Sequence, residues 1–457
     1  MRINTNMSAL RSCYQLNRAN DRLSASLERL SSGYKINSAE DSPVGAAMSQ
    51  KMKTQLRGLD RAIQNASDGI SVVETAEGAL NEVTEMIQRM RQLSVQGANG
   101  TMSAQDRQSL MDEISQLQNE IDRISNDTEY NTRGLINGEL SRRTYTDMPG
   151  VRSTYISDAV PAGAYKVIVN REATYSTLTS NPVDVPVTGI EVDGTINVNG
   201  ESVAIEKGDT IDEVLDKIKG VADLSDISVN YDGTNITFKS DILGSNYPIE
   251  INCTKELAEK LGLEMKLSAQ GTDANIELDT AANNIFKFPD STTLEVDGNN
   301  ITFSASGGFE MRVAIDEGTI AAPSVVMVRA LDIGTMVIQM GANEGQVMDI
   351  NIPEVSCAAM GLDKLNLHTE AGCDRAIGMC DDALKYISTV RSKLGAYANR
   401  MEHAVNSLNV TTENMTAALS RIEDVDMAKE MTNFTSQNVI TQAANSMLAQ
   451  ANQMPEK

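Results

Sequence analysis

The chain has 457 residues, no Trp, 4% aromatic residues and 23 Met, with 39 Lys and Arg against 63 Asp and Glu. Its formal charge of −24 argues against binding to nucleic acid or to anionic membranes, because both need a cationic surface. The shortage of aromatic residues argues against the bulky core of a compact enzyme. The length allows about two to four domains.

Targeting signals of the usual kinds are missing from the sequence. No run of about 18 apolar residues could form a transmembrane helix. The first residues, Met1 to Asn6, lack the basic and then apolar layout of a cleavable signal peptide. We therefore expect no secretion by the usual route, and export by another route stays open.

The first 140 residues are predicted to be helical. Apolar residues from Cys13 to Tyr34 recur at spacings of three, four and seven, and turn formers across residues 31–43 then break the pattern. A second helix carries Val73 to Met90 and is expected to end at the loop of residues 96–100.

A third helix follows, with a heptad stripe on one face. We expect this stripe to be a coiled-coil seam formed by Leu110, Ile114, Leu117 and Ile121. Residues 130–138 then predict a tight hairpin with an Asn-Gly turn.

The last hundred residues hold the longest periodic pattern. It predicts a helix over residues 373–425, which would be about 80 Å long at 1.5 Å per residue. So long an apolar stripe must be covered lengthwise by other helices, and the N-terminal helices are the expected partners. Its predicted seam residues are Ile387, Val390, Leu394, Met401 and Leu408.

The two ends of the chain carry weaker stripes. Neither residues 1–35 nor the residues beyond Val425 have enough apolar periodicity for an independent bundle. Two interpretations are open at this point. The ends are frayed, or they are helices that order when many copies pack together.

Residues 145–355 differ from both flanks, with alternating apolar and polar segments and one short helix around Ile211 to Ile218. The expected fold class is therefore a mainly α long-helix coiled-coil bundle, formed by the two terminal regions, with a β-rich α+β central insert. We expect one or two small lobes that project from the bundle, because both ends of the insert return to it.

Five cysteines occur, at 13, 253, 357, 373 and 380. An odd number without a CxxC motif predicts neither a disulfide framework nor a zinc site. Cys373 and Cys380 are seven residues apart on one helix face, and we expect both to be small buried apolar residues. No cofactor or metal is expected.

Several long motifs then occur in a fixed order at the two ends of the chain. They span residues 27–41, 65–71, 75–80, 420–426 and 447–453, and together they resemble the signature of bacterial flagellin. The resemblance covers about the first 140 and the last 100 residues. It implies a structural subunit that polymerises into the flagellar filament for motility, located outside the cell.

The resemblance also implies how the chain is divided and what it contacts. Expected partners are other copies of the chain, an export chaperone on the C-terminal segment, the filament cap, hook-associated proteins and the flagellin-sensing Toll-like receptor of hosts. Export would use the flagellar type III apparatus. The expected segments are an inner-shell helix and spoke (1–44), outer-tube helices and hairpin (45–144), the exposed insert (145–355), an outer-tube helix (356–415) and an inner-shell helix (416–457).

Two finer resemblances concern particular segments. Residues of about 190–255 are similar to the flagellin hook-IN motif, a small strand–helix–strand unit that implies no chemistry. Residues 88–96 match the receptor motif of flagellins, which implies contacts by Arg89, Leu93, Gln96 and Glu113. In the alternative interpretation, Leu93 packs within the bundle and Arg89 is a solvated charge or an assembly contact.

One departure from the family concerns the end of the sequence. Flagellins usually continue beyond the segment matched at 447–453 with a short Leu-rich tail, whereas this sequence stops at Lys457. Either this sequence is truncated or the protein has a charged, shortened end, and losing the tail would remove apolar surface from the innermost shell.

Rival functions are disfavoured by the residues present. The two histidines, His368 and His403, form no HExxH motif, and neither a Walker A loop nor GxGxxG occurs, so no enzyme is expected. A hook–filament junction protein shares similar termini, and a filament subunit with an adhesive insert is compatible with the same motifs.

Overall fold

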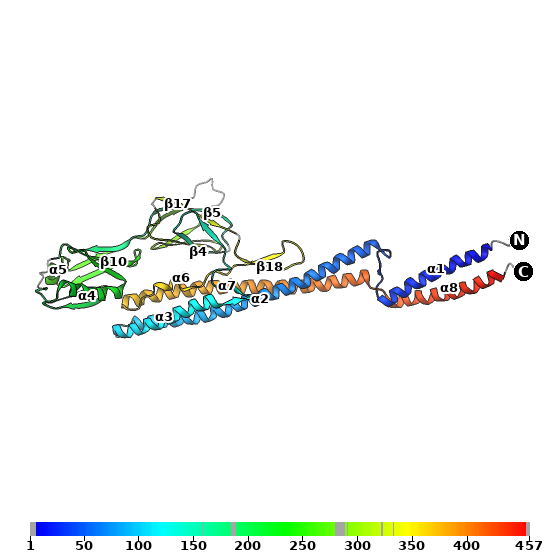
Figure 1. The fold of residues 1–457 in the computed structure, drawn as a ribbon, viewed down its shortest axis with the longest axis horizontal. Helices are drawn as coiled ribbons and strands as arrows, with labels where there is room; N and C mark the ends of the chain where they lie inside the picture. Colours follow the sequence, from blue (N-terminus) through cyan, green and yellow to red (C-terminus); the bar gives the residue numbers. More distant parts are fainter. Residues whose placement is uncertain are drawn as a thin grey trace. The chain divides into compact units, whose positions relative to one another are not determined.

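Terminal helices with a β-rich insert between them form the described part of the chain, as predicted (Figure 1). The computed structural model describes residues 6–157, 159–183, 189–278, 288–289, 291–320, 323–331 and 333–453. The first of two compact units consists of Met1–Gly69, Ile338–Met348 and Arg400–Lys457, and the second of Ile70–Val337 and Asp349–Asn399. The long helices α2 (Pro43–Gly97) and α7 (Glu370–Glu423) contribute to both units.

The first helix, α1 (Met7–Ser32), is defined by local signals at both ends. The side-chain oxygen of Asn6 accepts a hydrogen bond from the Ala9 amide at 3.0 Å, which caps the first turn. Gly33 ends the helix in the left-handed region at φ +76°, where a glycine carries no steric penalty. Since α2 begins at Pro43, the break predicted across residues 31–43 is confirmed.

The hairpin after α3 (Ala104–Asp127) has a different turn from the one predicted. Strands β1 (Glu129–Tyr130) and β2 (Arg133–Gly134) pair around Asn131 and Thr132, which take φ values of 52° and 65°. The prediction of an Asn-Gly turn at residues 137–138 is therefore wrong. Asn131 tolerates the left-handed conformation that a two-residue hairpin turn needs, so a glycine is not required there.

The C-terminal region begins with α6 (Cys357–Met360) and the short helix η2 (Leu362–Lys364). The long helix predicted over 373–425 is confirmed as α7, and α8 (Met427–Gln453) follows after a break. The expected segment boundary after residue 415 falls inside α7. The first residues of the sequence up to 5, and the final segment 454–457, lie outside the described residues.

The insert contains two β lobes, each with its own apolar core. The first has two four-stranded antiparallel sheets. One is β13-β5-β17-β3, with bounds Asn275–Leu278, Gly163–Arg171, Ser324–Ala330 and Thr144–Thr146. The other is β14-β15-β16-β4, with bounds Thr293–Asp297, Asn300–Ala305, Phe309–Ile315 and Val151–Ile156. An aromatic cluster lies in this core, formed by Tyr165, Phe288, Phe303 and Phe309.

The second lobe packs helices on its sheets. The sheet β6-β10-β9 has bounds Tyr175–Thr179, Ile236–Leu243 and Ile227–Tyr231. The sheet β12-β11-β7-β8 has bounds Lys266–Ala269, Ile249–Cys253, Gly194–Val198 and Glu201–Ile205. The short helix predicted near Ile211 is confirmed as α4 (Ile211–Ala222), which precedes η1 (Asp223–Ser225), and α5 (Lys255–Leu261) adds a further helix.

A small two-stranded sheet, β18 (Met336–Gln339) and β19 (Val347–Ile350), lies beside the long helices. Within the first unit, the Asn65 side chain donates a hydrogen bond to the Gln339 carbonyl at 3.1 Å. A Cβ placed on Gly58 would lie 2.9 Å from the Cβ of Ala342. The absence of a side chain at Gly58 therefore lets the segment 338–348 approach α2 closely.

Candidate assembly surface

The helices α1 and α8, which we call the terminal pair, lie side by side, with the start of α1 beside the end of α8 (Figure 1). Buried and half-buried residues form a stripe at alternating spacings of three and four on each helix. On α1 the stripe is Ala9, Ser12, Leu16, Ala19, Leu23, Ser26 and Leu30, and on α8 it is Glu430, Phe434, Gln437, Thr441, Ala444, Leu448 and Ala451. These two stripes face each other and form the terminal seam, which consists largely of small and polar residues.

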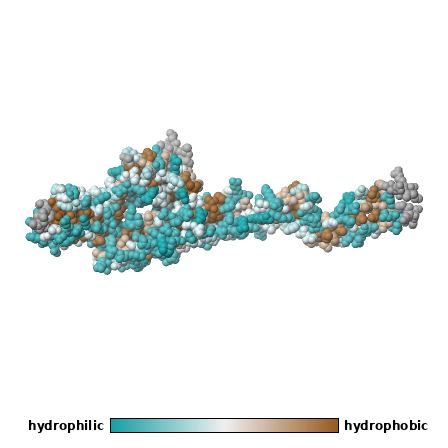
Figure 2. Space-filling model, viewed as in Figure 1, coloured by the Kyte–Doolittle hydropathy of each residue, from teal (hydrophilic) through white to brown (hydrophobic). Residues whose placement is uncertain are grey.

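Many large apolar residues of the terminal pair point outward, although Leu16, Leu23, Leu30, Phe434 and Leu448 lie in the seam. Nine of them are between 46% and 65% exposed, and Figure 2 shows hydrophobic residues on the surface of this pair. They are Met7, Leu10, Tyr14, Leu27, Met427, Met431, Val439, Ile440 and Met447. A pair that buries small residues and exposes large apolar ones has its strongest hydrophobic surface available to another molecule.

Polar contacts at three levels fix how α1 and α8 are aligned. The Asn6 side chain donates to the Ala451 carbonyl at 2.8 Å, and the Ser26 hydroxyl donates to a Glu430 carboxylate oxygen at 2.6 Å. Near the inner ends of the helices, the Val425 amide donates to the Gly33 carbonyl at 3.0 Å. The residue numbers in these contacts add up to nearly the same value, as a single antiparallel register requires.

The turn that follows α1 is organised by Asp41. Its carboxylate accepts hydrogen bonds from the Arg29 guanidinium at 2.9 Å and from the amides of Asn37 and Ser38, both at 3.1 Å. The Arg29 hydrogen bond, helped by the two amides, lowers the pKa of Asp41 below its usual value. Lys53 on α2 also pairs with Glu423 at the end of α7.

Arg89 and Glu113, two of the predicted receptor contacts, form an ion pair at 2.8 Å between α2 and α3. Both side chains are about half exposed, at 50% and 42%, and Gln96 is exposed as well. Leu93, by contrast, is 1% exposed. The expectation of a surface contact by Leu93 is wrong for this conformation, because its side chain packs inside the bundle, as the alternative interpretation stated.

The residues expected to form the coiled-coil seam lie mainly in the interior. Those that are buried are Leu110, Ile114, Ile121, Ile387, Val390, Leu394 and Met401. Leu117 and Leu408 are half-buried. In the second unit, Arg91 of α2 pairs with Asp381 of α7 at 2.6 Å, and a Cβ on Gly97 would meet the Cys373 sulfur at 2.7 Å, so α2 and α7 are in direct contact there.

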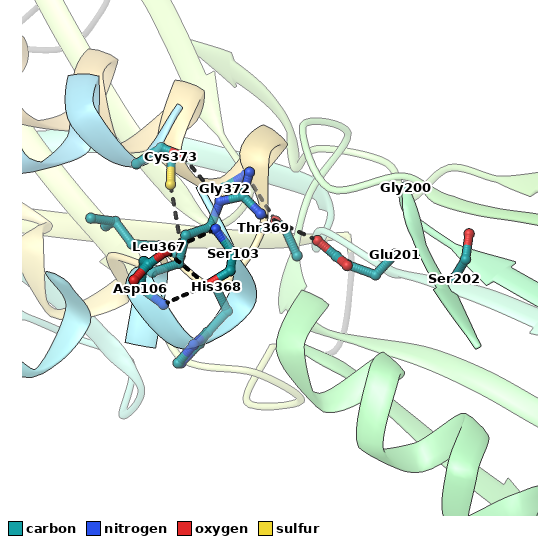
Figure 3. Close-up of polar contacts among 12 residues, drawn as sticks. Ser103, Asp106, Gly200, Glu201, Ser202, Leu367, His368, Thr369, Gly372 and Cys373 are labelled. Carbon is teal, nitrogen blue, oxygen red and sulfur yellow. Dashed lines mark hydrogen bonds and ion pairs between the residues drawn. The ribbon is translucent and has the colours of Figure 1, made fainter. Parts of the chain in front are cut away.

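Polar groups gather where α3 begins and α7 begins (Figure 3). Ser103 and Asp106 form a reciprocal capping box on α3, and the Gly372 amide donates to the Thr369 hydroxyl at 3.0 Å. Arg107 is buried, donates to the Gly97 carbonyl at 3.0 Å and lies 3.6 Å from Glu201 of β8. These contacts satisfy helix ends and one buried guanidinium, and they create no reactive group.

The described residues contain no group of three or more His, Cys, Asp or Glu that could hold a metal ion. None of the described helices has a stretch long and apolar enough to span a membrane. Cys373 and Cys380 are both fully buried, as predicted. Burial raises the pKa of the Cys380 thiol to about 11.

Comparison with known proteins identifies the family. Residues 3–141 match the bacterial flagellin N-terminal helical region, and residues 377–457 match the bacterial flagellin C-terminal helical region. A flagellin of Clostridium tyrobutyricum is 33% identical over 100% of both chains. Flagellin A of Vibrio anguillarum is 32% identical over 99% of this chain and 97% of its own.

The chain belongs to the flagellin family. Among solved structures, FliC from Burkholderia pseudomallei is 17% identical, with a TM-score of 0.24 over 73% of this chain and 99% of that chain. The flagellar hook associated protein-3 from Legionella pneumophila is 14% identical, with a TM-score of 0.33 over 82% of this chain and 98% of that chain.

Two features of this flagellin were missed by reasoning from apolar spacing alone. The predicted stripes at the termini mixed residues of two faces: Leu16 and Leu23 lie on the seam, whereas Leu27 and Met447 point outward. The Ser26–Glu430 contact was not anticipated, because polar residues were not considered as seam positions. Ser26 and Glu430 stand at the same alternating spacing of three and four as the other seam residues. A pattern that includes polar residues would therefore have identified both positions.

Proposed function

We propose that this flagellin is a structural subunit that polymerises with other copies of itself into the bacterial flagellar filament, for motility and outside the cell. The observation that carries the proposal is the terminal pair, in which nine large apolar side chains are exposed around a seam made largely of small and polar residues. Covering one such side chain stabilises a contact by roughly 1.5–3 kcal/mol before entropy is subtracted. Neighbouring copies in a lattice would supply that cover.

The test is growth on filament seeds, followed by electron microscopy. The purified chain should elongate the seeds, while Val439→Asp and Met447→Asp should each reduce elongation at least about tenfold, because a buried unpaired charge is costly. Asn445→Asp is the matched control, since it adds the same charge at an exposed polar position of α8. Absence of growth by the unaltered chain, or equal growth by all three variants, would contradict the proposal.

Family membership further supports export by the flagellar type III apparatus, with a chaperone on the C-terminal segment and addition of subunits near the filament cap and the hook-associated proteins. The exposed apolar residues of α8 are consistent with a need for cover before assembly. In a flagellated strain that lacks its own flagellin, the full chain should be exported, and a chain without residues 427–457 should lose chaperone binding. Unchanged chaperone binding by the shortened chain would place the chaperone elsewhere.

A second proposal concerns host recognition by Arg89, Gln96 and Glu113. These exposed side chains lie on the two helices α2 and α3, and the Arg89–Glu113 ion pair holds the first and last of them together. Arg89→Asp should weaken binding of the monomer to the flagellin-sensing Toll-like receptor, because it removes a cation and places two carboxylates side by side. Arg123→Asp is the control, since Arg123 is an exposed arginine of α3 that is also paired with carboxylates. Equal binding by both variants and the parent would end this proposal.

The insert segment of about 190–255 is proposed as a hook-IN-like decoration. The order of β7, β8, α4 and β9 supports it. Deleting residues 145–355 should leave filament assembly intact and remove any adhesion that the insert provides. Loss of assembly in this deletion would show that the insert takes part in polymerisation.

A further inference from the structure

We propose that a set of exposed methionines on the terminal pair makes assembly of this chain sensitive to oxidation by peroxide. We call this set the outer methionines, and its members are Met7, Met427, Met431 and Met447. The inference rests on the proposed function, because it concerns the surface that neighbouring copies are proposed to cover. The rate at which each methionine is oxidised is, by contrast, a property of the single chain.

Methionine is concentrated on the outward face of the terminal pair. Among the described residues, six methionines are exposed, and four of these six are the outer methionines. The other two are Met48 on α2 and Met265, which directly precedes β12. The outer methionines are also four of the nine large apolar side chains exposed on α1 and α8. A chemical change confined to methionine therefore alters a large part of this apolar surface.

Exposure separates the outer methionines from the methionines of the interior. The side chains of the outer methionines are between 48% and 64% exposed, whereas Met90 and Met401 are both 0% exposed. An oxidant in solution reaches a thioether sulfur only where the side chain is accessible. Hydrogen peroxide should therefore oxidise the outer methionines well before the interior ones, while the chain stays folded.

The reaction converts an apolar thioether into a polar sulfoxide. The sulfur attacks one oxygen of the peroxide, and a sulfur–oxygen bond forms as the oxygen–oxygen bond breaks. The second oxygen leaves as water after it takes up the proton of the first. The sulfur gives up an electron pair that the peroxide gains, so the reaction needs no further reactant. Methionine sulfoxide reductases reverse it.

A sulfoxide opposes the covering of this surface by another copy of the chain. Its oxygen accepts hydrogen bonds, and burying it against apolar side chains without a donor costs free energy. In the free subunit the same oxygen faces water, so the single chain keeps its fold. Oxidation therefore disfavours the assembled state and leaves the free subunit intact. In a filament the neighbouring copies would cover the sulfur atoms and protect them.

The experiment treats the full chain with hydrogen peroxide, in a Cys13→Ser background that removes an exposed thiol. Catalase stops the reaction, peptide mass spectrometry measures the sulfoxide at each methionine, and growth on filament seeds measures elongation. The resistant variant replaces the four outer methionines by leucine, which conserves apolar volume. Met265→Leu is the matched control, because it removes an exposed methionine of the insert that lies outside the terminal pair.

In the free subunit, the outer methionines should be oxidised at least about tenfold faster than Met90 and Met401. The treated parent and the treated Met265→Leu variant should each elongate seeds at least about tenfold more slowly than before treatment. The treated resistant variant should elongate as it does untreated, and sulfoxide reductases should restore elongation by the treated parent. In filaments grown from the parent, oxidation of the outer methionines should be slower than in the free subunit.

Undiminished elongation by the treated parent, or an equal loss in the resistant variant, would overturn the oxidation proposal and leave the filament proposal in place. Equal oxidation of the outer methionines in filaments and in free subunits would also overturn it, and this measurement decides if the resistant variant does not elongate before treatment. Failure of the untreated parent to elongate would contradict the filament proposal and the oxidation proposal together.

Discussion

The bundle of the second unit and the terminal pair are both built from helices with heptad-like spacing, yet the bundle buries its apolar stripe almost completely whereas the terminal pair leaves nine large apolar side chains exposed. In the bundle, the stripe of α2 is almost inaccessible and is formed by Val73, Ala76, Leu80, Val83, Ile87, Met90 and Leu93. In the terminal pair, the buried residues of α1 are Ala19 and Ser26, and those of α8 are Glu430 and Ala451.

This difference shows what periodicity does and does not determine. In both regions the spacing identifies a helix with distinct faces. Whether the chain itself covers the larger apolar face depends on how many partner helices it supplies. Among the described residues, the bundle of the second unit is built from α2, α3 and α7, whereas α1 and α8 of the terminal pair pack against each other, so one face of each stays exposed.

The largest expected difference between the bundle and the terminal pair is in the reactivity of their cysteine thiols. Cys380 is fully buried on α7, and its pKa of about 11 leaves roughly one thiolate in a thousand at pH 8. Cys13 is exposed on α1. Iodoacetamide labelling followed by mass spectrometry should therefore modify Cys13 at least about a hundredfold faster than Cys380. Comparable rates would mean that the bundle opens as readily as the terminal pair.

The next largest expected difference is in the free energy of unfolding after an apolar side chain of each region is shortened to alanine. Ile387→Ala should reduce the free energy of unfolding of the bundle by about 2–5 kcal/mol, because it leaves a cavity in a fully buried seam. Met447→Ala, which shortens an exposed side chain of α8, should change it by less than about 0.5 kcal/mol. Urea unfolding followed by circular dichroism measures both. A large loss in Met447→Ala would show that the isolated chain already covers this face.

Alanine substitutions of two glycines inside α2 should have smaller effects on the free energy of unfolding, and the two effects should have opposite signs. Gly58→Ala should lower the free energy of unfolding by about 1–2 kcal/mol, because the new Cβ would lie 3.3 Å from the Ala342 Cα and the segment around Ala342 would have to shift. Gly78→Ala has open space around it and should raise the same quantity by about 0.5–1 kcal/mol. The same urea experiment applies. Stabilisation by both substitutions would mean that the segment of residues 338–348 shifts without lowering the free energy of unfolding.

The smallest expected effect is a pH dependence in the turn beside the terminal pair. The pKa of Asp41 is lowered in the folded chain, so its contribution is present above its unfolded pKa near 4 and is lost as the pH falls through the lower folded value. The contribution should be about 1 kcal/mol or less.

Hydrogen exchange of the Asn37 and Ser38 amides, compared between pH 3 and pH 6 after correction for intrinsic rates, tests this pH dependence. Protection should fall with Asp41 protonation and should be low at both pH values in Asp41→Asn. Glu40→Gln, which alters an exposed neighbour, is the control. Equal protection in Asp41→Asn and the parent would remove Asp41 as the organiser of this turn.

Much of the fold follows from local signals in the sequence. The turn formers around Gly33 and Pro43 end one helix and start the next, and the uninterrupted stripe from Cys373 onward specifies one long helix. The alternating residues of the insert specified strands, but the pairing of β5 with both β13 and β17 depends on contacts far apart in the sequence. Such register is set by the fit of whole sheets and not by any one segment.

The residues of the candidate surface could be predicted less well from the sequence than the fold could. Leu93 lies in a matched motif, yet the motif does not state which way the helix faces, and the side chain is buried. Arg89 and Glu113 were named from a resemblance, whereas their ion pair depends on how α2 and α3 pack. At the termini, the outward direction of Val439 and Ile440 follows from the side on which α1 lies, and sequence spacing does not give that side.

The alignment of α1 with α8 has a consequence for the order of folding. The contact between Asn6 and Ala451 joins residues 445 positions apart, so nearly the whole chain must be made before it can form. Contacts of such high sequence separation carry a large loop-closure cost and form late. The terminal helices should accordingly be the last part of the chain to close and the first to open, which leaves both ends free while the rest of the protein is already folded.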